Sequence, residues 1–193
     1  MDEICVSAVV HVSQEEAYEF LLDFPGYAKY SQYLEDVERF QGEGGPGTRY
    51  GLTFSWWKLS YTAHSKVTSV DPPERIDWRL TKDIDAYGHW RTEPLDLEPK
   101  EALETDSGAV AANPHGEACE VTFTVFFDPE SARSGVLDLP RIVSFDWVLS
   151  KVVPRMKREA ERIVSRAVAD LEGRPRAVEL DVHVDTGGNG SSR

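Results

Sequence analysis

Two side chains on one predicted strand have the chemistry to move protons. Tyr61 and His64 both lie in the stretch 59–70. An imidazole titrates near neutral pH, and a positioned imidazole or phenol can act as a general acid or base. A histidine base also needs a carboxylate or carbonyl that orients it, and the sequence identifies no such partner. Tyr61 and His64 are therefore the candidate catalytic residues, and an outward-facing strand position without chemistry is the alternative for each.

Other patterns that often carry chemistry predict no catalytic, metal or cofactor site. The sequence holds no nucleophile elbow and no HExxH pattern. Residues 42–47 satisfy GxGxxG, but they precede a predicted strand, whereas phosphate binding needs such glycines to begin a helix. We interpret them as a turn. Cys5 and Cys119 are too few for a metal cluster, and we expect two buried, reduced thiols.

Three further polar side chains follow the alternation of their strands. His89 and Arg91 flank Trp90, and Arg79 lies between Trp78 and Leu80. Successive strand residues point to opposite faces. If the tryptophans point into the protein, His89, Arg79 and Arg91 point outward.

The strands also place large apolar side chains on one common face. We take eight residues as the candidate ligand-binding residues, seven from strands and one from the C-terminal helix: Tyr50, Leu52, Phe54, Trp56, Trp78, Trp90, Phe123 and Met156. Such a set lines a pocket if it leaves space, since pockets for small molecules are mainly apolar. The alternative is a dry core, because aromatic residues dominate cores.

The pattern of elements predicts an α+β fold. A capping box at Ser13 and Glu16 begins a helix at 14–24, a second helical turn covers 27–34, and a long amphipathic helix covers 145–171, with a kink at Pro154. The predicted strands are 4–12, 36–41, 48–56, 59–70, 75–81, 87–97 and 119–127. A sheet of seven sequential antiparallel strands must bury its apolar face against another element. Only the C-terminal helix is long enough to cover that face. We therefore predict a curved sheet wrapped around that helix.

Two segments do not fit this scheme. Residues 98–117 carry many acids and no apolar period, so we expect an exposed acidic loop. We assign residues 1–172 to the domain and 173–193 to a C-terminal tail. Within the tail, 177–185 alternates and predicts an added edge strand or a segment ordered by a partner; the remainder is expected to be disordered.

Several motifs in this order resemble the SRPBCC superfamily, also called START-like or helix-grip proteins. The matching stretches are 12–23 (VSQEEAYEFLLD), 24–27 (FPGY), 45–50 (GPGTRY), 67–78 (VTSVDPPERIDW) and 88–91 (GHWR). The resemblance implies a hydrophobic cavity between sheet and C-terminal helix, reached past the short helices. Members bind lipids, quinones or polyketides, usually without metal or nucleotide, and a minority catalyse cyclisation or dehydration. The 98–117 insertion and the chain beyond 173 depart from the family pattern.

The charge balance excludes some partners. The 193 residues carry a formal net charge of −13, which disfavours nucleic acid and anionic lipid and suits a high-salt, halophilic interior. No stretch is long enough to span a membrane, and the start lacks a signal peptide, so we expect a cytoplasmic protein. One basic stripe, on the C-terminal helix, predicts either peripheral membrane contact or a solvated face: Lys151, Arg155, Arg158, Arg162 and Arg166.

These observations together predict a carrier for a hydrophobic small molecule, a lipid or isoprenoid quinone, bound between sheet and helix. The alternative is an enzyme of the polyketide cyclase/dehydratase kind, in which His64 or Tyr61 moves protons in the same cavity. A third hypothesis is a partner protein whose segment 178–184 adds to another chain's sheet. The oligomeric state stays open.

Overall fold

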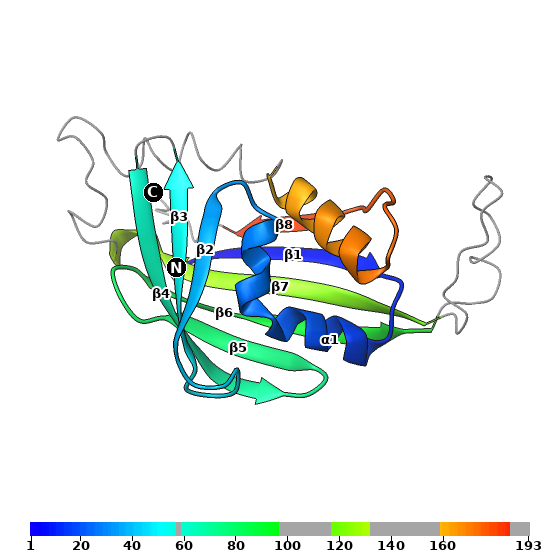
Figure 1. The fold of residues 1–193 in the computed structure, drawn as a ribbon, viewed down its shortest axis with the longest axis horizontal. Coiled ribbons are helices and arrows are strands. Elements are labelled where there is room, and N and C mark those ends of the chain that lie inside the picture. Colours follow the sequence, from blue (N-terminus) through cyan, green and yellow to red (C-terminus); the bar gives the residue numbers. More distant parts are fainter. Residues whose placement is uncertain (57–58, 97–116, 132–158, 186–193) are drawn as a thin grey trace, which may run out of the picture.

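The fold, seen in a computed structural model, is an antiparallel sheet curved around the C-terminal helix (Figure 1). The structure describes residues 1–56, 59–96, 117–131 and 159–185. Within these ranges the strands are β1 (Asp2–Val10), β2 (Leu34–Gln41), β3 (Arg49–Trp56), β4 (Leu59–Asp71), β5 (Arg75–Leu80), β6 (Asp85–Leu95), β7 (Ala118–Asp128) and β8 (Asp181–Asp185). Their order in the sheet is β2-β3-β4-β5-β6-β7-β1-β8, so the predicted seven-stranded antiparallel sheet is confirmed and an eighth strand extends it.

Register in the sheet follows the alternation of apolar residues. Trp90 on β6 lies opposite Phe123 on β7, and Phe123 lies opposite Val6 on β1. Successive residues point to opposite faces, so these apolar side chains share the concave face, while Tyr87 and Phe126 stack on the convex face. Arg79 and Arg91 are exposed, as the alternation predicts.

The first helix, α1 (Gln14–Leu22), begins as expected and the segment after it does not. Ser13 accepts a hydrogen bond from the Glu16 backbone, and Glu16 reaches back to Ser13, which completes the capping box. The predicted second helical turn at 27–34 is instead the 3₁₀ helix η1 (Phe24–Lys29). Pro25 lies in the first turn of η1. An amide hydrogen at this position would have no acceptor within the helix, so proline is compatible with the start of η1.

The C-terminal helix is described from residue 159 to residue 171 and lies over the curved sheet in Figure 1. Arg166 donates to the Tyr30 carbonyl, and the Tyr30 hydroxyl donates to Asp170, each at 3.0 Å. These bonds join the helix to the end of η1. The predicted kink at Pro154, together with Met156, Lys151, Arg155 and Arg158, lies outside the described residues.

A second set of bonds fixes the end of this helix to the sheet. Glu172, whose side chain is 2% exposed, accepts from Arg176 at 2.7 and 2.8 Å and from the His11 backbone amide at 2.9 Å. Burial alone would raise the pKa of Glu172, but the Arg176 hydrogen bonds outweigh it, and the pKa lies below its usual value. Arg176 also donates to the Val9 carbonyl. The chain beyond the helix is thus held against the end of β1 before it enters β8.

Two hydrophobic clusters make up the described core. The larger lies between α1, η1 and the strands β2–β5, with Tyr50, Val67 and Ile76 at its centre, while the smaller joins Val10 and Cys119 to Val168 of the C-terminal helix. Cys5 and Cys119 are both free. No helix in the described part of the chain is long and apolar enough to cross a membrane.

Candidate ligand-binding site

A cavity of about 670 Å³ separates the sheet from the C-terminal helix. Its described lining comes from β6, β7, β1, β8, α1, η1 and the C-terminal helix, and almost all of it is apolar. The lining residues are Ile4, Val6, Ser7, Ala8, Val10, Ala17, Phe20, Leu21, Tyr27, Tyr30, Trp90, Val121, Phe123, Val125, Ala160, Val164, Ala167, Val168, Leu171, Leu180, Val182 and Val184. A volume of this size is typical of small-molecule sites, which range from about 300 to 1,000 Å³.

The floor of the cavity is a row of side chains that crosses four strands. Trp90, Phe123, Val6 and Val182 are successive cross-strand partners on β6, β7, β1 and β8. The Trp90 and Phe123 rings lie 4.5 Å apart between centroids. The floor is therefore aromatic at its β6 end and aliphatic at its β8 end.

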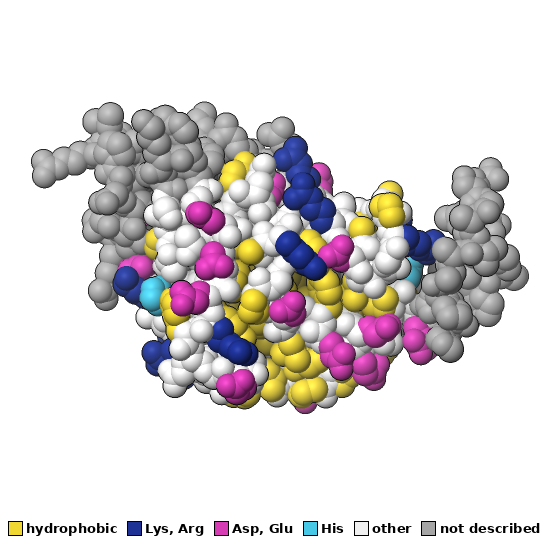
Figure 2. Space-filling model, viewed as in Figure 1, with side chains coloured by type: hydrophobic (Ala, Val, Ile, Leu, Met, Phe, Trp, Pro, Cys, Tyr) yellow, Lys and Arg dark blue, Asp and Glu magenta, His cyan; other side chains and the backbone are white. Residues whose placement is uncertain are grey.

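Small side chains on the opposite wall leave this space open. Ala160, Val164, Ala167, Val168 and Leu171 are the described residues of the C-terminal helix that face the cavity. These residues recur three or four positions apart, so they share one helix face. Four of these five side chains are no larger than valine, so the described part of the helix leaves a gap above the sheet. In Figure 2 hydrophobic side chains reach the surface between this helix and α1.

The two phenols on the cavity wall already have hydrogen-bond partners. The Tyr27 hydroxyl donates to the Leu21 carbonyl, and the Tyr30 hydroxyl donates to Asp170. Burial, together with the nearby Asp23 carboxylate, raises the pKa of Tyr27 well above its usual value. Both phenols therefore favour the protonated form, since each donates its hydroxyl hydrogen to a protein acceptor and the pKa of each is raised. In the described ranges no group of three or more His, Cys, Asp or Glu side chains could hold a metal ion.

The structure distributes the predicted ligand-binding residues over three environments. Trp90 and Phe123 line the cavity. Trp78 stacks on Phe123 at 5.8 Å, in space left by Gly88, where a Cβ would lie 2.8 Å from the Trp78 ring. Tyr50 is in the packed core, stacked on Phe24 at 4.9 Å.

The other predicted lining residues lie farther away on β3 or cannot be placed. Leu52 packs at the edge of the larger core cluster, and Phe54 is 39% exposed. The side chain of Trp56 and all of Met156 lie outside what the structure describes. The cavity therefore brings together Trp90 and Phe123 and leaves Tyr50, Leu52 and Phe54 on other parts of the sheet.

Neither candidate proton carrier lies on the described cavity wall. His64 is on the convex face, where its ring lies 5.4 Å from that of Phe40, while its neighbours Ala63 and Ser65 are buried on the concave side. The Tyr61 hydroxyl contacts Asp83 at 3.5 Å, and burial followed by the Asp83 carboxylate raises the pKa of Tyr61.

His89, which the strand alternation predicts to point outward, shares the convex face with Asp77 and Arg75. Burial and the neighbouring Arg75 lower the pKa of His89. This group is separated from the cavity by the sheet itself, so it has no route to a molecule bound there.

Much of the cavity lining that the sequence analysis did not predict comes from β1, β8 and the C-terminal helix. The apolar positions of β1 and β8 alternate visibly in the sequence, as Ile4, Val6 and Ala8 and as Leu180, Val182 and Val184. That alternation predicts a strand face but not what covers it. The small residues of the helix were likewise visible as an apolar stripe.

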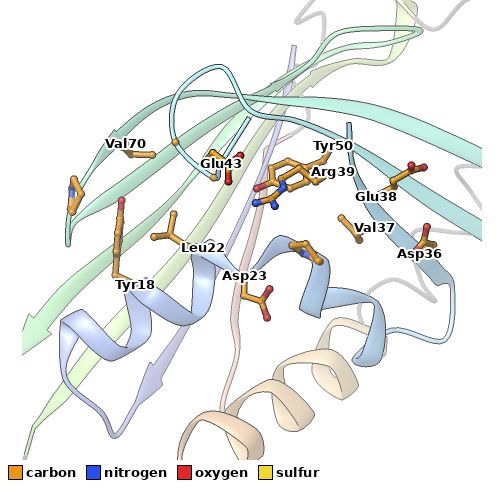
Figure 3. A pocket seen from close by; sticks show the side chains of 14 residues that line it. Tyr18, Leu22, Asp23, Asp36, Val37, Glu38, Arg39, Glu43, Tyr50 and Val70 are labelled. Carbon is orange, nitrogen blue, oxygen red and sulfur yellow. The ribbon is translucent and has the colours of Figure 1, made fainter. Parts of the chain in front are cut away.

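A second hollow lies on the other side of η1 (Figure 3). Its volume is about 780 Å³, and Tyr18, Leu22, Val37, Tyr50 and Val70 form its apolar part. Asp23, Asp36, Glu38 and Glu43 surround it with Arg39, so its border is mainly acidic. A hydrophobic ligand loses less contact with water in this hollow than in the sheet–helix cavity, which is therefore the better candidate.

Comparisons with known proteins agree with the architecture. The sequence pattern of a family described as polyketide cyclase / dehydrase and lipid transport matches residues 1–172. The Zhui aromatase/cyclase from Streptomyces sp. R1128 is 17% identical, covers 92% of this chain and 98% of its own, and has a TM-score of 0.61. A START superfamily protein from Mycobacterium smegmatis is 12% identical, covers 89% of this chain and 99% of its own, and has a TM-score of 0.58.

No curated protein matches the chain in sequence. At such low identities the solved structures show the shared fold alone, whereas the family pattern extends over most of the chain. The chain belongs to the polyketide cyclase/dehydrase and lipid transport family.

Proposed function

We propose that this protein binds and carries a hydrophobic small molecule, a lipid or an isoprenoid quinone, in the sheet–helix cavity. The observation that supports this most is the continuous apolar lining on both the sheet and the helix, around a volume of about 670 Å³. Each Å² of apolar ligand surface that leaves water contributes about 25 cal/mol, so a lining of this kind binds mainly by desolvation.

The described lining fits a carrier better than it fits an enzyme that catalyses cyclisation or dehydration. A cyclase needs a group that moves a proton at the substrate. The phenols of Tyr27 and Tyr30 are engaged with protein acceptors, and His64 lies on the opposite face of the sheet. Membership of a family that includes cyclases and lipid transport proteins fits either activity.

A titration with N-phenyl-1-naphthylamine, a neutral dye that fluoresces in apolar surroundings, tests the proposal. Val164→Trp places an indole in the cavity from the helix side, and we expect dye affinity at least about tenfold lower, or about 1.4 kcal/mol. Ser165→Trp adds the same side chain at the next, exposed position and should bind like wild type.

Circular dichroism checks that both variants are folded. A folded Val164→Trp protein with wild-type dye affinity would show that the dye binds elsewhere and would contradict the proposed site. Absence of dye binding in the wild type would contradict the proposed function.

A further inference from the structure

The added strand β8 forms one wall of the cavity although it lies beyond the part of the chain that matches the family. The family pattern ends at residue 172, whereas β8 spans Asp181–Asp185 and pairs antiparallel with β1. Leu180, Val182 and Val184 all line the cavity. Without them the lining would end on β1.

The position of β8 determines how far the floor extends. Adjacent strands lie about 4.8 Å apart, so the row from Trp90 to Val182 spans about 14 Å, of which β8 supplies the last third. The aromatic rings are at the β6 end of this row, and valines occupy the β1 and β8 end. An elongated ligand with an aliphatic part fits this gradient best, with that part lying over β1 and β8.

The anchoring of the tail shows that β8 is held in place and is not a loosely attached end. Arg176 bonds to Glu172 on the helix side and to the Val9 carbonyl at the end of β1. The two faces of β8 also differ as a cavity wall requires. On the cavity side Val182 is half-buried and Val184 is 50% exposed, whereas the other side carries the polar, exposed Asp181 and His183.

We infer that β8 is a specificity element: its valines set the length of aliphatic chain that the cavity accepts. This inference rests on the proposed function and adds the part of the ligand and the part of the chain that recognise each other. It predicts that changes on β8 affect long ligands and leave short ones unaffected.

The test is displacement of N-phenyl-1-naphthylamine by straight-chain 1-alkanols of increasing length. In the wild type each added methylene should strengthen binding about fourfold until the chain fills the floor. In Val182→Trp this increase should stop at a shorter alcohol, so that the longest alcohols bind at least about tenfold more weakly and the shortest bind equally. His183→Trp, on the opposite face of the same strand, should behave like wild type.

Each outcome bears on a different claim. A Val182→Trp protein that binds all alcohols like wild type, or all of them equally more weakly, would overturn the role of β8 while leaving the cavity as the binding site. A wild type that binds neither dye nor alcohol would refute the proposed function and this inference together. If Val182→Trp does not fold, Val182→Leu, a smaller enlargement, should show the same length dependence in weaker form.

Discussion

The two halves of the concave face have the same strand pattern and different contents. Over β2–β5 the centre of the face is filled, since Phe24 of η1 stacks on Tyr50 and Ile76 is 0% exposed, and the hollow beside them has an acidic border. Over β6, β7, β1 and β8 it is hollow, because the covering helix presents Ala160, Val164 and their small neighbours. Alternating apolar residues make either half, and the size of the covering side chains decides which half packs and which can bind.

The largest expected effect comes from cutting the same side chain in each half. Ile76→Ala should lower the free energy of unfolding by about 2–5 kcal/mol, since it leaves a void in a close-packed core. Ile4→Ala, on the cavity wall, should lower it by less than about half as much, because its side chain already borders open space. Urea unfolding measures both values. Equal losses would mean that the hollow half is packed like the filled half.

The next prediction concerns the hydrogen bonds that Glu172, at the end of the C-terminal helix, accepts from Arg176 and from the His11 backbone amide. Glu172 has a depressed pKa, so its contribution to stability is fully present above its usual pKa of 4.5 and is lost as the pH falls through the lower folded value. Glu172→Gln should therefore lower the free energy of unfolding at neutral pH by about 1.5–3 kcal/mol and weaken its dependence on acid. Urea unfolding across the acid range measures this, with Glu161→Gln, at an exposed position, as the control. Parallel pH profiles for wild type and Glu172→Gln would contradict the assigned role.

A smaller effect separates two tryptophans that both contact Phe123. Trp90→Leu should weaken dye binding about fivefold, because an aromatic contact is worth about 0.5–1.5 kcal/mol and Trp90 lines the cavity. Trp78→Leu should change binding less than about twofold, since Trp78 supports Phe123 without lining the cavity. The reverse order would place the ligand on the other side of Phe123.

Much of the fold follows from local patterns in the sequence. The capping box at Ser13, the alternation through Trp78 and Trp90, and the turn at 42–47 each depend on neighbouring residues, and the structure agrees with all three. The helical turn expected at 27–34 lies earlier in the chain, at Phe24–Lys29, because Pro25 fits the first turn of η1.

The division between core and cavity depends on contacts between distant segments. Tyr50 and Phe123 have the same alternation in sequence, yet one packs under Phe24 and the other borders open space. That difference is determined by where η1 crosses the sheet, which no local pattern encodes. For the same reason alternation over 177–185 predicted either an edge strand or a segment ordered by a partner, and it could not predict that Val182 would complete the floor.

Native mass spectrometry of the protein purified from its own host, followed by organic extraction, tests the occupied cavity most directly. We expect a mass above that of the bare chain, released on extraction as an apolar molecule with an aliphatic part, and absent from Val164→Trp prepared in the same way. A bare-chain mass for the wild type, or the same bound mass on the cavity-filling variant, would contradict the account.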